Sequence, residues 1–352
     1  MDTLIFLGGD YKKGAGGIAS VLREYSKLYP KAIFIFTLEP GGKVKKMLCM
    51  IVALFKLFIA LINNKNNIVH IHGASKSSFY RKYFFYKVAK LFRAKIIYHI
   101  HGGGFGDFYL NSNSLVKKKI KLVINNVDCL ICLSPQWETF YKKNFSPKKI
   151  RIINNIIPYI PIYKSIKSKE FITFLFLGDI TERKGTWLLL KVIDEIKSNL
   201  SGKARFLIGG KGEIDKLNTI IKKDKLENIV KYIGWVDGET KQKSFLDSNV
   251  FILPSYIEGL PISILEAMSY GLSIISTNVG GIPEVVHDEY NGYLIEPRSK
   301  EQLKKSILKC MENPSLMKSY GENSLKLVKP FYPEEVKKEL DKLYNELSMN
   351  PI

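Results

Sequence analysis

Short runs of β-branched and aromatic residues alternate with longer helical patterns along the whole chain of 352 residues. This alternation is typical of parallel sheets built from strand-helix-strand units and predicts an α/β fold. The first series of expected strands occupies residues 3–7, 32–36, 68–71, 95–99, 129–133 and 150–153. The second series occupies residues 171–177, 204–208, 230–233, 250–253, 273–276 and 293–295.

A segment without hydrophobic periodicity, IIPYIPIYKSIKSKE, separates the two series and predicts a linker near residues 156–170. Two sheets joined by one linker leave a cleft between them. We therefore expect an N-terminal domain over residues 1–160 and a second domain over residues 161–330. The last predicted helix lies outside both series, and residues 331–352 are expected to pack back on the N-terminal domain.

The net charge of +21 lies entirely in the first half of the chain. Residues 1–170 carry 29 Lys and Arg against 8 Asp and Glu, whereas residues 171–352 carry 25 basic and 25 acidic residues. A partner with phosphate groups is therefore expected to meet the first half: anionic lipid headgroups, a diphosphate-linked acceptor or nucleic acid. A solvated basic surface is the alternative that requires no partner.

One apolar run, residues 47–62, is shorter than the ~20 residues that a membrane span needs, and it contains Lys56. It fits either a core helix or a helix lying in the membrane interface with lysines at its ends. The chain opens without an export signal, and its 4 cysteines suit a reducing compartment. We expect a cytoplasmic protein that is peripheral on the inner face of the cell membrane.

Two loops have the composition of phosphate-binding sites. Gly16 and Gly17 precede the first predicted helix, where backbone amides and the positive end of the helix can approach a phosphate. Arg183 and Lys184 open a helix expected over residues 186–200. Adjacent cations at a helix N-terminus can hold a diphosphate.

Four of the five histidines form two pairs at the ends of predicted strands, His70 with His72 and His99 with His101. Alternation along a strand places both members of a pair on one face, which makes a metal site conceivable. The carboxylates that usually complete such a site are missing nearby, so no metal is expected. We expect a functional role for His101, beside a glycine turn where open sheets contact ligands, and packed positions for His70 and His99.

The most specific pattern is LPSYIEGLPISILEAMSYG, residues 253–271. It places Glu258 just before a helix that starts near residue 262, and Glu266 inside that helix. Proline at the start and glycine at the end frame the helix. Two carboxylates in this apolar setting resemble acceptors for the hydroxyl groups of a polyol more than an acid/base pair.

This segment, with the later STNVGGIPEVV and NGYLIEP, resembles the donor domain of retaining GT-B glycosyltransferases of family 4. The resemblance covers the whole chain and is densest over residues 171–297. It implies two Rossmann-like domains whose parallel sheets face a central cleft. It also implies a hexosyltransferase that moves a sugar from a UDP-sugar or GDP-sugar to a hydroxyl with retention at the anomeric carbon, without a cofactor or metal.

The same resemblance assigns the site residues. Catalytic roles fall to His101, Arg183, Lys184 and Glu258. Donor binding falls to Gly16, Gly17, Gly210, Trp235, Glu258, Gly259, Leu260 and Glu266. The two cations would neutralise the leaving diphosphate. Asp179 departs from the family pattern, which often has arginine there. No carboxylate is identified as a covalent nucleophile, so the leaving phosphate is expected to deprotonate the acceptor.

The basic first half favours a lipid-linked acceptor, a glycan on a polyprenyl diphosphate used in capsule, O-antigen or exopolysaccharide synthesis. Soluble acceptors stay open. Two other functions are weighed against this one. A nucleotide-sugar epimerase on a similar fold would act without an acceptor. A nucleic-acid-binding protein would also be basic, but the sequence has no RNP-like motif, zinc finger or helix-turn-helix pattern, so nucleic acid is not expected as a partner.

Overall fold

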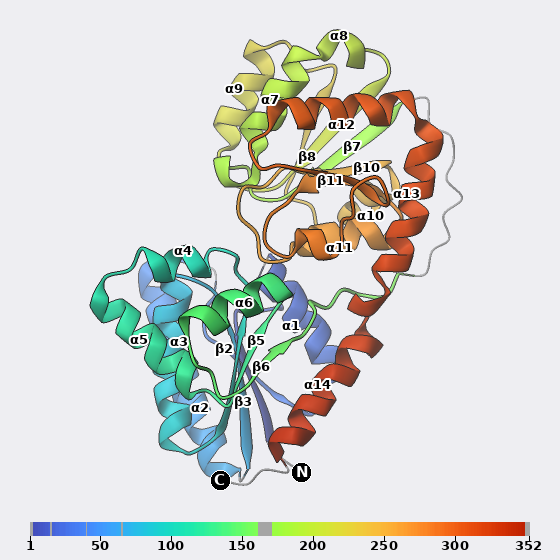
Figure 1. Cartoon of the computed structure of the whole chain (residues 1–352). Coiled ribbons are helices and arrows are strands. Elements are labelled where there is room, and N and C mark those ends of the chain that lie inside the picture. Colours follow the sequence, from blue (N-terminus) through green and yellow to red (C-terminus); the bar gives the residue numbers. More distant parts are fainter. Residues whose placement is uncertain (1–2, 15, 40, 65, 161–170, 349–352) are drawn as a thin grey trace. The chain divides into compact units, whose positions relative to one another are not determined.

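The structure is a computed structural model that describes residues 3–14, 16–39, 41–64, 66–160 and 171–348. The chain divides into two compact units (Figure 1). The first unit contains Met1–Pro158 and Pro330–Ile352, and the second contains Tyr159–Lys329. Most of the expected linker, residues 161–170, and the last four residues of the expected terminal segment lie outside the described residues.

The first unit is a parallel sheet of six strands in the order β2-β1-β3-β4-β5-β6. These strands are β1 Thr3–Gly8, β2 Ile33–Phe36, β3 Asn67–Gly73, β4 Lys95–Ile100, β5 Cys129–Cys132 and β6 Ile150–Ile152. Its helices are α1 Gly17–Leu28, α2 Lys43–Asn63, α3 Ser77–Leu91, α4 Phe105–Leu110, α5 Ser114–Asn126, α6 Pro135–Asn144 and α14 Pro333–Ser348. In Figure 1, α2 and α3 lie on one side of this sheet and α1 and α14 on the other. Both faces are therefore covered, and every residue of β3 is buried.

The second unit repeats the layered arrangement with the strand order β12-β11-β10-β7-β8-β9. Its strands are β7 Ile172–Leu177, β8 Ala204–Gly209, β9 Val230–Gly234, β10 Val250–Leu253, β11 Ser273–Thr277 and β12 Gly292–Ile295. Its helices are α7 Thr186–Glu195, α8 Lys197–Leu200, α9 Ile214–Lys223, α10 Gly238–Leu246, α11 Ile262–Ser269, α12 Lys300–Glu312 and α13 Pro314–Leu327, with short 3-10 turns at Glu182–Lys184, Ile282–Glu284 and Lys329–Phe331. The predicted α/β class and the parallel sheets are confirmed, and every predicted strand is present with ends within two residues of those expected.

Strand order changes direction once in each sheet, between β1 and β3 and between β7 and β10. In open parallel sheets, ligands bind beyond the carboxyl ends of the strands at such a switch point. The sequence motifs after β7 and after β10 therefore meet at the place where this fold presents a binding site.

Two helices differ from the expectation. The helix expected over residues 186–200 is broken at Ile196, where the backbone leaves helical dihedrals. Ile196 and Leu200 are both buried. The apolar run 47–62 lies in α2, of which only 22% of the most apolar window is buried. The core-helix interpretation is therefore wrong for most of this run.

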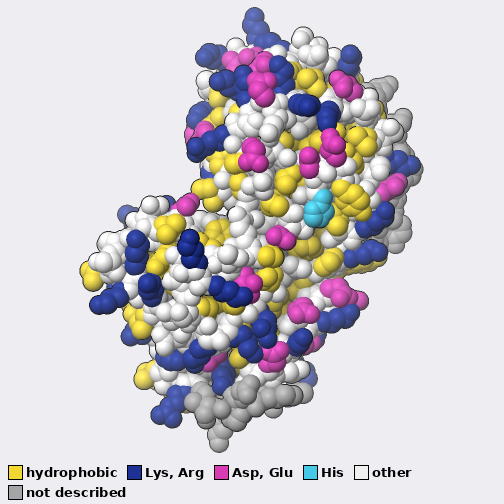
Figure 2. All heavy atoms as spheres, in the orientation of Figure 1, with side chains coloured by type: hydrophobic (Ala, Val, Ile, Leu, Met, Phe, Trp, Pro, Cys, Tyr) yellow, Lys and Arg dark blue, Asp and Glu magenta, His cyan; other side chains and the backbone are white. Residues whose placement is uncertain are grey.

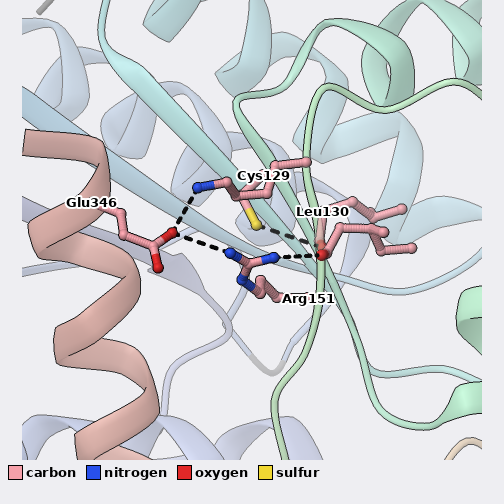
Figure 3. Close-up of polar contacts among 6 residues, drawn as sticks. Cys129, Leu130, Arg151 and Glu346 are labelled. Atoms are coloured by element: carbon pink, nitrogen blue, oxygen red, sulfur yellow. Dashed lines mark hydrogen bonds and ion pairs between the residues drawn. The ribbon is translucent and has the colours of Figure 1, made fainter. Parts of the chain in front are cut away.

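Helix α14 packs on the first unit through polar contacts near its C-terminal end. Figure 3 shows Glu346 of α14 facing the edge strand β6, where its carboxylate accepts from Arg151 at 3.3 Å. The same carboxylate pairs with Lys149 at 2.6 Å. Deeper in the unit, the Tyr344 hydroxyl lies 2.8 Å from Nδ1 of His70. A segment distant in sequence thus closes one face of the first sheet.

Candidate functional site

The loops that follow β7 and β10 touch one another. The backbone N–H of Tyr256 donates to the carbonyl of Arg183 at 2.8 Å. Gly185 has a φ of +73°, and a Cβ there would lie 2.0 Å from the Pro254 carbonyl oxygen. Glycine is therefore required where the two loops approach, and their contact fixes the cation-bearing turn against the segment that carries Glu258.

Glu258 forms a nearly buried ion pair with Lys184. The ammonium donates to Oε1 of the carboxylate at 2.5 Å, and the two side chains are 12% and 8% exposed. Removing either partner would leave a poorly solvated charge, which makes such a pair costly to break. The sequence motif and the cationic turn, 74 residues apart in the chain, are thus joined at one point.

Arg183 is held beside the segment of Glu258 by two polar contacts. One guanidinium nitrogen donates to the carbonyl of Ile257 at 3.2 Å, and another lies 3.6 Å from Oδ2 of Asp179. The exposed carboxylate of Asp179 therefore competes with a bound anion for the Arg183 guanidinium. Arg183 lies beside the backbone that leads into Glu258, on the surface of the loop.

Glu266 is held separately, by a lysine that sequence reasoning missed. It lies on α11 and is 8% exposed. Nζ of Lys241, on α10, lies 2.6 Å from its carboxylate. Nothing in the sequence pattern marks Lys241, because the contact depends on how α10 packs beside α11.

Gly259 and Leu260 connect the two carboxylates. The Gly259 carbonyl accepts from the N–H of Gly281 at 2.5 Å, and the Leu260 side chain is buried. A Cβ on Gly280 would lie 2.1 Å from the carbonyl oxygen of Glu258. Gly280, the first glycine of the GG in STNVGGIPEVV, is therefore required by close packing against the loop of Glu258.

Gly210 and Trp235 lie beyond the ends of β8 and β9. A Cβ on Gly210 would lie 1.8 Å from the carbonyl oxygen of Gly178, so glycine is needed there for the packing of two adjacent loops. Trp235 is 39% exposed, and Nζ of Lys211 lies 4.5 Å from the centre of its ring. An exposed indole with a lysine over one face offers a surface for stacking.

In the first unit, Gly16 and Gly17 are exposed at the start of α1, beyond the end of β1. Gly16 has a φ of +102°, which residues with a Cβ rarely adopt. Nearby, Oδ1 of Asp10 accepts from the backbone N–H groups of Lys12 and Lys13 and shapes the turn. The loop thus presents backbone at the switch point of the first sheet.

His101 is partly exposed and oriented through both ring nitrogens. Nδ1 lies 3.2 Å from Oδ1 of Asn155, and Nε2 lies 2.8 Å from Nδ1 of His72. Desolvation by the packed surroundings lowers the pKa of His101 to about 4, against the opposing effect of the Asn155 hydrogen bond. The imidazole is therefore neutral near pH 7, with its N–H on Nδ1 if the Asn155 oxygen accepts. Sequence reasoning missed Asn155, although a polar residue just past the end of a strand was the sign to look for.

His70, His72 and His99 form a buried stack whose geometry disfavours a metal ion. Candidate ligand atoms of His70, His72 and His99 lie within 4.8 Å of one another. However, the His70 ring is inclined by only 17° to that of His72 and by 21° to that of His99. A bound ion lies in the plane of each imidazole that holds it, and nearly parallel planes do not meet at one ion. His70 and His99 are fully buried, in the packed positions expected for them.

Comparison with known proteins agrees with this architecture. The family model described as glycosyl transferases group 1 matches residues 162–327. An uncharacterized glycosyltransferase of Methanocaldococcus jannaschii is 31% identical over 277 residues, which cover 74% of this chain and 70% of the relative. A 41.2 kDa protein in the cps region of Klebsiella pneumoniae is 27% identical over 310 residues, with 80% and 83% covered. The solved structure of Anabaena HepE with UDP superposes with a TM-score of 0.79 at 15% identity and covers 98% of this chain and 100% of HepE.

Proposed function

This chain belongs to the family of glycosyl transferases group 1, and from that premise we propose that it is a retaining hexosyltransferase. The proposed donor is a UDP-sugar or GDP-sugar carrying a hexose or N-acetylhexosamine. The proposed acceptor is a hydroxyl of a lipid-linked glycan. Anabaena HepE, a protein of the same fold, has been solved with UDP, which supports a nucleotide diphosphate donor.

The observation that carries the proposal is the pair of shielded carboxylates at the β7/β10 switch point. Glu258 and Glu266 are 7% and 8% exposed, and each is neutralised by its own lysine. Carboxylates held in this way accept hydrogen bonds from hydroxyl groups. Glu258 would bind the sugar and Glu266 the ribose, while Lys184 retains further N–H groups for the diphosphate between them.

The proposed reaction breaks the bond between the anomeric carbon and the diphosphate oxygen and forms a bond from that carbon to the acceptor oxygen. The acceptor's proton goes to the leaving diphosphate on the same face of the sugar. Arg183 and Lys184 would stabilise the negative charge that develops there. Glu258 is not proposed as a nucleophile, because its carboxylate is tied to Lys184 at 2.5 Å. His101, kept neutral and oriented by His72 and Asn155, would position the sugar.

The acceptor proposal rests on charge. The first unit carries 29 basic and 12 acidic residues, whereas the second carries 25 and 21. Figure 2 shows Lys and Arg side chains spread over the visible face of the first unit. A polyprenyl-diphosphate-linked glycan at an anionic membrane surface suits this charge. The Klebsiella relative from a cps region supports a role in surface polysaccharide synthesis. We accordingly place the protein in the cytoplasm, peripheral on the inner face of the membrane.

A screen of nucleotide sugars, run in excess EDTA, tests the proposed reaction. We expect one sugar nucleotide to release its nucleoside diphosphate slowly alone and faster when a lipid-linked glycan is added. The rate should not depend on EDTA, because Arg183 and Lys184 supply the charge that a metal would otherwise provide. Conversion of the sugar without an acceptor would indicate an epimerase, and a strict need for Mg²⁺ or Mn²⁺ would contradict the proposed site.

Changing Lys43, Lys45 and Lys46 together to glutamate is expected to release the protein from anionic vesicles. All three are exposed, and each basic residue near such a surface contributes about 1 kcal/mol. Flotation with phosphatidylglycerol-containing vesicles at low salt measures the effect. Affinity for the donor nucleotide should stay unchanged, because the proposed carboxylates lie in the other unit. Equal binding by wild type and the triple variant would show that these lysines are not the contact.

A further inference from the structure

The outward face of α2 carries a continuous apolar stripe. Its nine side chains are 41–68% exposed and follow one another at intervals of one or three residues: Val44, Met47, Leu48, Ile51, Val52, Phe55, Phe58, Ile59 and Ile62. At ~100° per residue these positions fall within an arc of about 140° around the helix. Nine half-exposed side chains of this size exceed the apolar patches of a few hundred Å² that are normal on soluble proteins (~300–600 Å²).

The opposite face of α2 packs into the core of the first unit. Ala53, Leu57, Ala60 and Leu61 are buried in one cluster with residues of β3 and α3. The helix is long and apolar enough to cross a membrane by length and composition. Crossing would nevertheless pull Leu57, which is fully buried, out of the core. The stripe can therefore meet an apolar phase only with the helix lying along its surface.

The charges around the stripe select among the possible occupants. Lys43, Lys45 and Lys46 lie at its first turn and Lys56 within its length, and no acidic residue occurs between Glu39 and Asp107. A second copy of the chain would bring the same lysines against these in a symmetric contact, and the carboxylate beside them, that of Glu39, already lies 3.8 Å from Lys45. An anionic bilayer offers acyl chains to the stripe and negative headgroups to the lysines.

We propose that α2 inserts this stripe into the acyl boundary of an anionic bilayer, lies parallel to the surface and so holds the first unit on the membrane. The inference rests on the proposed action on a lipid-linked acceptor. It adds that apolar insertion, and not charge alone, provides the attachment. Part of the binding should consequently survive high salt, which screens the lysines but leaves apolar burial intact.

The double variant Leu48→Ser/Phe55→Ser removes apolar contact without touching the core, since the two side chains are 54% and 63% exposed. We expect its partition onto vesicles of phosphatidylcholine with one third phosphatidylglycerol to fall at least about tenfold, with the larger relative loss at high salt. The matched control is Leu316→Ser, on α13 of the second unit and 36% exposed, which should bind like wild type. Equal binding by the double variant and wild type would overturn the proposal.

A second measurement reports insertion directly. Phe55→Trp should gain fluorescence that is quenched by brominated acyl chains, whereas Leu316→Trp should not. Absence of quenching at Phe55→Trp would overturn insertion. Sedimentation of wild type and the double variant tests whether a second copy of the chain covers the stripe instead. That would be the case if only wild type dimerises and the two proteins bind vesicles equally. Donor hydrolysis is measured on the same proteins: its absence with quenching intact would count against the transferase proposal and leave insertion standing.

Discussion

Replacing Glu258 with glutamine is expected to lower turnover by about 100-fold or more, equivalent to about 3 kcal/mol of transition-state stabilisation. Glutamine keeps the shape of the side chain but removes the charge that neutralises Lys184 at 2.5 Å. It also donates where a carboxylate only accepts, so the hydrogen bonds from sugar hydroxyls would be lost or reversed. Steady-state release of nucleoside diphosphate measures the change.

The matched control is Glu213→Gln. Glu213 also pairs with a lysine, Lys216 at 3.2 Å, but on the exposed surface of the same unit. Surface pairs of this kind contribute little to stability, so turnover and melting temperature should both stay near wild type. Because Lys184 is left short of its partner in Glu258→Gln, the melting temperature of that variant is measured as well. A near-normal rate in a folded Glu258→Gln protein would remove Glu258 from the proposed site.

Glu266→Gln is expected to lower turnover by a similar factor, about 100-fold or more, through a different step. In the proposed site Glu266 binds the ribose, so the loss should appear in the affinity for the free nucleoside diphosphate as well as in turnover. Lys241, at 2.6 Å from the carboxylate, would be left 27% exposed and can be solvated, so the fold should persist. Calorimetric titration with UDP and GDP separates this effect from that of Glu258→Gln.

The contrast between the two variants is informative in itself. Glu258→Gln should retain most of its affinity for the nucleoside diphosphate, which lacks the sugar. Glu266→Gln should lose much of it. If both variants bind and turn over normally, the β7/β10 switch point is not the donor site. If the losses are exchanged between the two, the roles of the carboxylates are reversed.

The strands of the two sheets could be predicted because short apolar runs in the local sequence determine where buried parallel strands form. The run that forms β3 places the apolar residues Ile68, Val69 and Ile71 around His70 and ends in glycine, so its position could be predicted from the local pattern. The alternation of period two likewise placed His99 and His101 on one face, where their rings stack at 4.0 Å. The roles of Glu258 and Lys184 were predicted from the family resemblance, whereas their contact depends on β7 and β10 being adjacent in the sheet.

The remaining contacts could not be predicted, because they depend on packing between segments far apart in the chain. Lys241 reaches Glu266 only through the packing of α10 beside α11. Asn155 reaches His101 because β6 lies in the same sheet as β4, 54 residues away in sequence. The apolar run of α2 has no polar face to orient it. Only the placement of Ala53 and Leu57 against the sheet decides which arc is left exposed.

The central claim is that the second unit binds the nucleoside diphosphate of a sugar donor at the β7/β10 switch point. Thermal unfolding with and without ligand tests it most directly, since a ligand that binds only the folded state raises the melting temperature with its concentration. We predict that UDP or GDP raises the melting temperature of the wild-type protein, that Glu266→Gln abolishes most of the shift, and that an oligonucleotide of equal phosphate content has no effect. Stabilisation by the oligonucleotide alone, or an undiminished shift in Glu266→Gln, would contradict the claim.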